Sequence, residues 1–165
     1  MFVLDKGTRF VVPRTEMTYP AHNLKLHQNA ADPVKSPVDH VMADFEDACP
    51  YEFKGEKSRK VMVEALNTLN FGAKVVTVRP NNIHSPFFQG DMEAIVLGAP
   101  DRFHGIILPK TRGPEEIRDV SDLLDDLAHT EVGGEVGDAE DESAHPIGGS
   151  RDLISMDQGL RRLDE

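Results

Sequence analysis

The sequence of 165 residues has a single cysteine, Cys49, and no tryptophan. One cysteine cannot form an internal disulfide, and it cannot supply the paired Cys-x-x-Cys ligands of a zinc module. Because no activating neighbour of Cys49 is evident in the sequence, we expect a small buried residue there and not a nucleophile. The seven histidines form no His-x-x-x-His pair on one predicted helix, so they give no metal site either.

Long apolar runs and an excess of positive charge are also missing. No segment approaches the roughly 20 apolar residues that cross a bilayer, and we expect a cytoplasmic protein without membrane association. The 29 acidic and 18 basic residues give a net charge of −11. This charge repels nucleic acids and anionic membranes, so neither is an expected partner. A small anionic ligand stays compatible with it, because a few arginines can form a local basic pocket.

Apolar segments with strand and helix periodicity alternate along the first 129 residues. The patterns predict strands over 15–19, 38–44, 74–79 and 104–109, and helices over 24–31, 54–69, 91–97 and 115–127. Asn23 and Asp91 are expected to cap two of these helices. Strands that alternate with helices through short loops are typical of repeated βα units. The predicted fold class is therefore α/β with a parallel sheet.

Polar side chains gather where three consecutive predicted strands end. Asp44, Glu46 and Asp47 follow the second strand, Arg79 ends the third, and Lys110 ends the fourth. In parallel sheets, ligands bind at the carboxyl ends of the strands, so these groups predict one shared site. For the acidic stretch by itself, a solvated turn is an equal alternative. For Arg79, the structural alternative is a salt bridge to Glu46 or Asp47.

The pattern of apolar segments stops after His129. Residues 130–150 are rich in glycine and acidic side chains and contain no aliphatic run, which is typical of a flexible acidic linker. A short helix over 155–163 is predicted beyond it. We therefore expect an α/β domain over residues 1–129 and an acidic tail over residues 130–165.

Four ordered segments carry a family resemblance over about two-thirds of the chain. They are RTEMTYPAHNLKLHQNAA (14–31), MADFEDACPYEFKGEKSRKVMVEALNTL (42–69), FGAKVVTVRPNNIHSPFFQGD (71–91) and GIILPKT (105–111). In this order and spacing they resemble the HpcH/HpaI aldolase and citrate lyase β-subunit family, in its malyl-CoA lyase branch. The resemblance implies a (β/α)₈ TIM barrel, usually oligomeric, that binds Mg²⁺. It also implies cleavage or formation of a carbon–carbon bond, usually in a CoA thioester.

The resemblance also implies roles for the residues at the strand ends. Arg79 corresponds to an arginine that holds the carboxylate of a keto acid together with the metal. Glu46 and Asp47 are implied to orient this arginine and the waters around the metal, and Asp44 to face the barrel interior. For Lys110, shaping the pocket and capping the strand end are equal alternatives.

Near the first strand, the chain both matches the family and departs from it. Arg14 fits a basic position and is implied to lie near the carboxylate or phosphates of the ligand. Thr18, Asn23 and Asn29 stand where malyl-CoA lyases carry an aromatic residue, an arginine and a lysine that grip CoA. Pro80 removes a backbone donor directly after Arg79.

The metal ligands and the length give the largest departures. Counting along the family pattern places the metal-binding glutamate at Glu140 or Glu142, in the stretch without strands, and its aspartate has no defensible counterpart. A (β/α)₈ barrel needs about 250 residues, whereas four βα units are visible here. We therefore expect a truncated or half barrel with two open sheet edges and little turnover in isolation.

Three functions follow as hypotheses. The first is Mg²⁺-dependent cleavage of a CoA thioester such as malyl-CoA. The second is an inactive or regulatory half-barrel that pairs with a full-length paralogue. The third is an aldolase of the same superfamily that acts on a 2-keto acid without CoA. The expected partners are a CoA thioester or a small keto or hydroxy acid, and a second copy of the chain or a complementary chain.

Overall fold

The computed structural model describes residues 2–4, 8–10 and 13–132, with side chains from 13 to 129. Its central element is a four-stranded parallel sheet in the order β3-β4-β5-β6. These strands are β3 (Glu16–Pro20), β4 (His40–Asp44), β5 (Val75–Arg79) and β6 (Gly105–Ile106). A short antiparallel pair, β1 (Phe2–Leu4) and β2 (Thr8–Phe10), precedes them.

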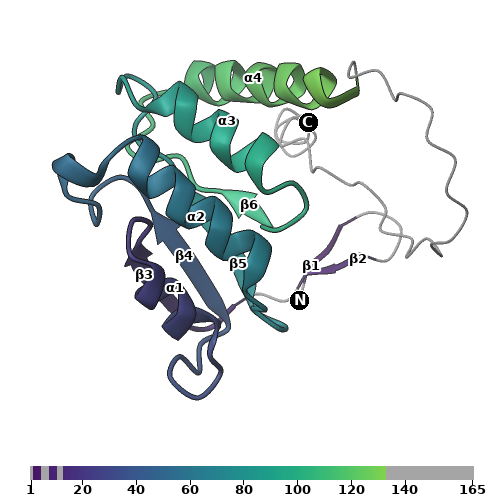
Figure 1. Ribbon diagram of the computed structural model, residues 1–165. Coiled ribbons are helices and arrows are strands. Elements are labelled where there is room, and N and C mark those ends of the chain that lie inside the picture. The colour runs from purple at the N-terminus through teal and green to yellow at the C-terminus, as the bar shows by residue number, and fades with distance from the viewer. Residues whose placement is uncertain (1, 5–7, 11–12, 133–165) are drawn as a thin grey trace, which may run out of the picture.

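A helix follows each strand of the parallel sheet. These are α1 (Leu24–Ala31), α2 (Glu56–Thr68), α3 (Phe88–Gly98) and α4 (Pro114–Val132), with a 3₁₀ turn η1 (Tyr51–Phe53) before α2. The helices cover one face of the sheet, as Figure 1 shows. The predicted α/β fold class, with four parallel strands alternating with helices, is confirmed and is consistent with part of a TIM barrel.

The hydrophobic core lies between the sheet and the helices. Val41, Ala43 and Val78 are fully buried in one cluster with Met62 of α2 and Ile95 of α3. Because side chains alternate along a strand, the neighbouring positions of β4, including Asp44, point to the opposite face. All five residues of β4 are buried, and the three between His40 and Asp44 are apolar, as expected for a strand that is covered on both faces.

The register of the sheet aligns the ends of three strands. Pro20 pairs with Asp44, and Asp44 pairs with Arg79. The ladder continues one residue further, because Phe45 N donates to Arg79 O at 2.9 Å and Ala21 N donates to Asp44 O at 2.9 Å. The residues predicted to share a site therefore lie at, or directly follow, strand ends on the same edge of the sheet.

The predicted cap of α1 is confirmed, since the Asn23 side chain accepts a hydrogen bond from Leu26 N at 3.3 Å. In the turn after α2, Gly72 has a φ of +62°, in the left-handed region that glycine adopts without strain.

Other local predictions differ from the structure. Asp91 is not a helix cap: α3 begins at Phe88, and the Asp91 side chain is buried in its first turn. Helix α2 begins at Glu56 instead of residue 54, because Gly55 turns the chain with a φ of +89°. Strand β6 has two residues instead of six and pairs with β5.

Strands β3 and β6 are the outer strands of the described sheet, each with one neighbour. No helix in the described part of the chain is both long and apolar enough to span a membrane. Helix α4 continues to Val132, beyond the predicted end at residue 127. The rest of the predicted acidic tail, with its short helix over 155–163, lies outside the described residues.

Candidate functional site

Asp44 and Arg79 form a two-pronged ion pair at the carboxyl edge of the sheet. Arg79 Nε donates to Asp44 Oδ1 at 2.9 Å, and Nη2 donates to Oδ2 at 2.6 Å. Asp44 is fully buried, and its oxygens also accept the N–H groups of Glu46 and Ala48, both at 2.8 Å. The sequence suggested Glu46 or Asp47 as the partner of Arg79. Asp44 takes this place because the register sets it directly beside Arg79.

The environment keeps this pair charged. Burial raises the pKa of Asp44, but hydrogen bonds from Arg79 and two N–H groups and the charge of Arg79 outweigh it, so its pKa lies below the ordinary value. The bond to Asp44 likewise raises the pKa of Arg79. The Arg79 side chain is 24% exposed, and its Nη1 makes no hydrogen bond to any described residue. Arg79 is thus fixed on one side and open to an anion on the other.

Lys110 joins the two remaining carboxylates. Its ammonium contacts Glu46 Oε1 and lies 3.0 Å from Asp47 Oδ1. The hydrogen bond with Lys110 is the main cause that lowers the pKa of Asp47, and Glu46 and Asp47 raise the pKa of Lys110. Lys110 has a φ of +55°, an uncommon value for a residue with a side chain. The other oxygen of Glu46, Oε2, is buried and has no hydrogen-bond partner among the described residues.

The structure does not bring Arg14 to this cluster. Arg14 precedes β3, so it lies at the amino edge of the sheet, where Nε bonds Asp39 Oδ2 at 3.1 Å. A groove of about 570 Å³ lies at that same edge, lined by Pro13, Val38, Phe71 and Lys74 among others. The opposite placement follows from the chain direction, because residues that enter parallel strands lie at the other edge from residues that leave them.

The described residues do not fit a magnesium ion by themselves. Within them, no group of three His, Cys, Asp or Glu side chains is placed to hold a metal. Both oxygens of Asp44 accept hydrogen bonds from Arg79 and backbone N–H groups. The Lys110 ammonium donates hydrogen bonds to the carboxylates of Glu46 and Asp47. Glu140 and Glu142, the two candidates from the sequence, lie outside the described residues.

Lys54 and Asn81 belong to the site region, and the sequence analysis missed both. Lys54 Nζ donates to the carbonyls of Phe45 and Glu46 and to Asn81 Oδ1. Asn81 follows Arg79 by two residues and is buried. Both residues lie inside segments that carry the family resemblance, 42–69 and 71–91. Each follows a strand that ends in a charged residue, and this position could have pointed to them.

Aromatic rings surround the same edge. His22, after β3, stacks on Phe53 of η1 with ring centroids 4.5 Å apart. The rings of Tyr51 and Phe87 pack edge to face, with centroids 5.6 Å apart. Tyr51 is largely exposed. The loops after β3, β4 and β5 therefore contact one another through side chains around the strand ends.

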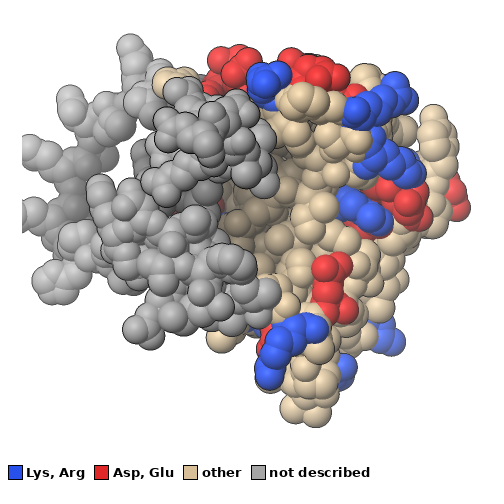
Figure 2. Space-filling view, turned by 180° about the vertical axis from the view of Figure 1, so that it is seen from behind, with Lys and Arg blue, Asp and Glu red and all other residues tan. Residues whose placement is uncertain are grey.

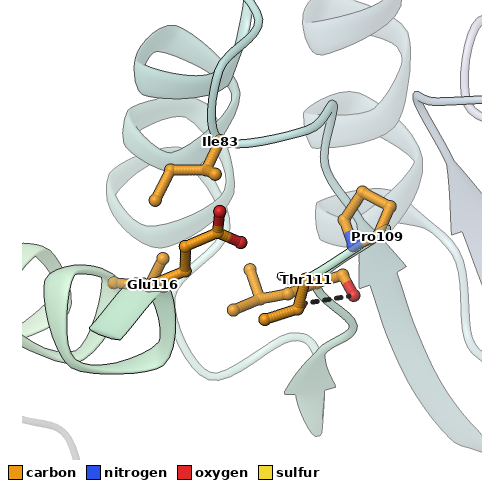
Figure 3. Close-up of a pocket in the computed structure, with 6 residues that line it drawn as sticks. Ile83, Pro109, Thr111 and Glu116 are labelled. Atoms are coloured by element: carbon orange, nitrogen blue, oxygen red, sulfur yellow. Dashed lines mark hydrogen bonds between the residues drawn. The ribbon is translucent and has the colours of Figure 1, made fainter. Parts of the chain in front are cut away.

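A small apolar hollow lies beside the loop that leads to α4. Figure 3 shows Ile83, Pro109, Thr111 and Glu116 around it. Glu116 Oε1 pairs with His84 Nε2 at 2.9 Å, and its Oε2 accepts Arg112 N at 3.0 Å. These contacts connect the loop after β5 with the first turn of α4. In the view from behind, basic and acidic side chains are interspersed over the visible described face (Figure 2).

The family model for HpcH/HpaI aldolase/citrate lyase matches residues 17–141, which include the whole strand-end cluster. The chain belongs to this family. The predicted resemblance is thereby confirmed, and it agrees with the βα units and with the charged residues at the strand ends.

Individual relatives of the family are similar at about 30% identity. The Malyl-CoA/beta-methylmalyl-CoA/citramalyl-CoA lyase of Chloroflexus aurantiacus is 30% identical over 106 residues, which cover 64% of this chain and 30% of that protein. The citrate lyase subunit beta of Leuconostoc mesenteroides subsp. cremoris is 27% identical over 147 residues, or 89% of this chain and 42% of that protein. An L-malyl-CoA/beta-methylmalyl-CoA lyase of Cereibacter sphaeroides is 33% identical over 89 residues, which cover 54% of this chain and 28% of that protein. The chain thus spans less than half the length of these relatives.

Proposed function

We propose that this chain takes part in carbon–carbon bond cleavage of the citrate lyase and malyl-CoA lyase type, in the cytoplasm, with a CoA thioester such as malyl-CoA as substrate. The observation that carries the proposal is Arg79, a guanidinium fixed by a buried carboxylate at the carboxyl edge and open on its other side. A planar guanidinium suits the two-pronged binding of a carboxylate.

The proposed reaction is a retro-aldol cleavage of a β-hydroxy thioester. The hydroxyl group of malyl-CoA loses its proton, and the bond from the carbinol carbon to the carbon next to the thioester breaks. The products are glyoxylate and the enolate of acetyl-CoA, which then takes up a proton. Arg79 binds the carboxylate that becomes part of glyoxylate, and Asp44 holds the guanidinium in place, so no reorganisation is needed when charge develops.

Enzymes of this family are typically metal-dependent, and Mg²⁺ is the proposed ion. Because the described carboxylates are already engaged, its ligands would come from elsewhere, and Glu140 and Glu142 stay the proposed candidates. The role of Arg79 does not depend on this assignment.

Cleavage assays test the proposal. We expect the 165-residue chain to show little or no cleavage of malyl-CoA with Mg²⁺ alone. Cleavage to glyoxylate is expected when it is mixed with the C-terminal segment of the Chloroflexus aurantiacus relative, and R79K should abolish it. R14K, at the opposite edge, is the control. Cleavage by the chain alone contradicts the low turnover, and a mixture that neither binds nor cleaves malyl-CoA contradicts the lyase proposal.

A half-barrel that pairs with another chain is a second candidate. The edges of β3 and β6, which pair with no further strand among the described residues, support it, because unpaired strand edges promote association. The partner would be a second copy or a longer paralogue. Light scattering during size-exclusion chromatography is expected to show an oligomer, and a stable monomer counts against this candidate.

A 2-keto acid aldolase without CoA is a third candidate. Thr18 Oγ1 donates to Glu16 Oε1 at 3.0 Å, and Asn23 caps α1, so two of the positions that replace CoA-gripping residues already have partners in the chain. Calorimetric titration with CoA, pyruvate and glyoxylate separates this candidate from the first. Binding of pyruvate without binding of CoA would favour it.

A further inference from the structure

A lysine side chain joins the ends of β4 and β5 beneath the candidate site. Lys54 Nζ donates to Phe45 O at 3.0 Å, to Glu46 O at 2.7 Å and to Asn81 Oδ1 at 2.5 Å. An ammonium group has three protons, so these three acceptors satisfy it completely. Lys54 has no donor left for a ligand, and its effect on the site must pass through the groups that it holds.

The network continues from Asn81 into the helices. Asn81 Nδ2 donates to Asp91 Oδ2 at 2.6 Å, and Asn81 N donates to the same oxygen at 3.1 Å. Asp91 is fully buried, and its Oδ1 accepts Arg59 Nε of α2 at 2.8 Å. The Arg59 guanidinium lies against Gly90, where an added Cβ would be 2.5 Å from Nη1. Paired charges thus fix the loop after Arg79 to both α2 and α3.

We propose that Lys54 is a positioning residue of the candidate site, through its bonds to the Glu46 carbonyl and to Asn81. The bonds to Phe45 and Glu46 fix the backbone from which the Glu46 carboxylate projects toward Lys110. The bond to Asn81 fixes the segment that follows Arg79. The inference rests on the proposed function, since it concerns the same strand-end groups.

Lys74 offers a matched control elsewhere in the fold. Its ammonium also donates to three oxygens of the chain, the carbonyls of Ala30 at 2.5 Å, Ser36 at 2.7 Å and Asp32 at 3.4 Å. Lys74 precedes β5, so it lies at the amino edge, away from the site. K54M and K74M therefore remove the same kind of contact at opposite edges of the sheet.

The test is an NMR titration of the Lys110 side chain in the 165-residue protein, compared with K54M and K74M. Both variants are expected to unfold at lower urea concentration. Only K54M should shift the pKa of Lys110 downward, because a Glu46 carboxylate that is no longer held interacts more weakly with the ammonium. K54R, which keeps a cation and its donors, should recover part of the shift. An unchanged Lys110 pKa in folded K54M overturns the proposal, and so does an equal shift in K74M.

A second variant keeps the test decisive if K54M does not fold. N81A removes one acceptor of Lys54 and leaves the two carbonyls in place. It is expected to lower the pKa of Lys110 less than K54M would, and no change in folded N81A overturns the proposal. The titration needs no substrate, so its result is independent of whether the lyase proposal holds.

Discussion

At the scale of single residues, Asp44 and Arg79 depend on each other more than any other charged pair at the strand ends. D44N leaves a partly buried guanidinium without its counter-ion, and breaking such a pair costs about 3–5 kcal/mol. We therefore expect D44N to lower the free energy of unfolding by roughly 3 kcal/mol. Urea unfolding measures the loss. The matched control is D39N, which breaks the exposed pair with Arg14 and should cost much less. Equal losses in D44N and D39N would show that the Asp44–Arg79 pair does not stabilise the fold more than an exposed pair does.

His27 gives a pH dependence at the same scale. Its ring is buried beside Tyr19, and Nε2 bonds Ala21 O at 2.9 Å, while Nδ1 is buried without a hydrogen-bond partner in the described part of the chain. Burial is the main cause that lowers the pKa of His27 to about 4. Between pH 6.5 and 4 the unfolded chain therefore binds a proton that the folded protein does not, and stability falls as the pH falls.

The expected loss from His27 is roughly 2 kcal/mol between pH 7.5 and pH 5. Urea unfolding at the two pH values measures it, with H27Q as the control, because glutamine can still donate to the Ala21 carbonyl without titrating. A wild-type protein and an H27Q variant with the same pH dependence would show that His27 is not held neutral.

The sequence predicted which residues collect at the strand ends, but not their pairing. Glu46, Asp47 and Lys110 do contact one another, and Asp44 accepts the Glu46 N–H beside them, since parallel strands end at one edge. Which carboxylate meets Arg79 depends on the strand register, which single strands do not reveal. The position of Arg14 was predictable, because a residue that precedes a strand lies at the opposite edge from one that follows it.

At the scale of elements, α2 and α3 approach each other at Gly98. A Cβ added there would be 2.9 Å from Val63 Cγ2 of α2, closer than ordinary contact. G98A is expected to lower the free energy of unfolding by about 1–2 kcal/mol through overpacking. V63A should relieve the strain, so the double variant V63A/G98A should be more stable than the sum of the two losses predicts.

A second glycine serves as the control for this prediction. At Gly105 an added Cβ would lie 3.9 Å from Thr77 Cγ2, which is ordinary contact, so G105A should have a small effect. Additive losses in the V63A/G98A cycle, measured by urea unfolding, would contradict the close approach of the two helices.

The elements themselves were predictable where periodicity was long. Helices α2 and α4 and the strands β4 and β5 follow their apolar patterns, because one face of each helix and both faces of each strand are buried. Asp91 was misjudged because an acidic residue before an apolar run resembles a cap. Its true role depends on Arg59, 32 residues away, and such a partner leaves no local signal.

At the scale of the whole molecule, the described residues form four βα units around a parallel sheet with a charged carboxyl edge, in which β3 and β6 each have one neighbouring strand. The family match covers residues 17–141, and the chain spans less than half of each named relative. The parallel βα arrangement was predictable from the sequence pattern and the family resemblance, whereas the metal ligands were not, because Glu140 and Glu142 have no strand pattern around them.

Calorimetric titration of glyoxylate into the wild-type chain, R79K and R14K tests the placement of the site at Arg79. We expect binding to the wild type and at least about a tenfold weaker Kd in R79K, since a two-pronged charged contact is worth about 1.5–3 kcal/mol. R14K, at the opposite edge, should bind like the wild type. Equal binding by R79K and the wild type, or a loss confined to R14K, would contradict the placement of the site at Arg79.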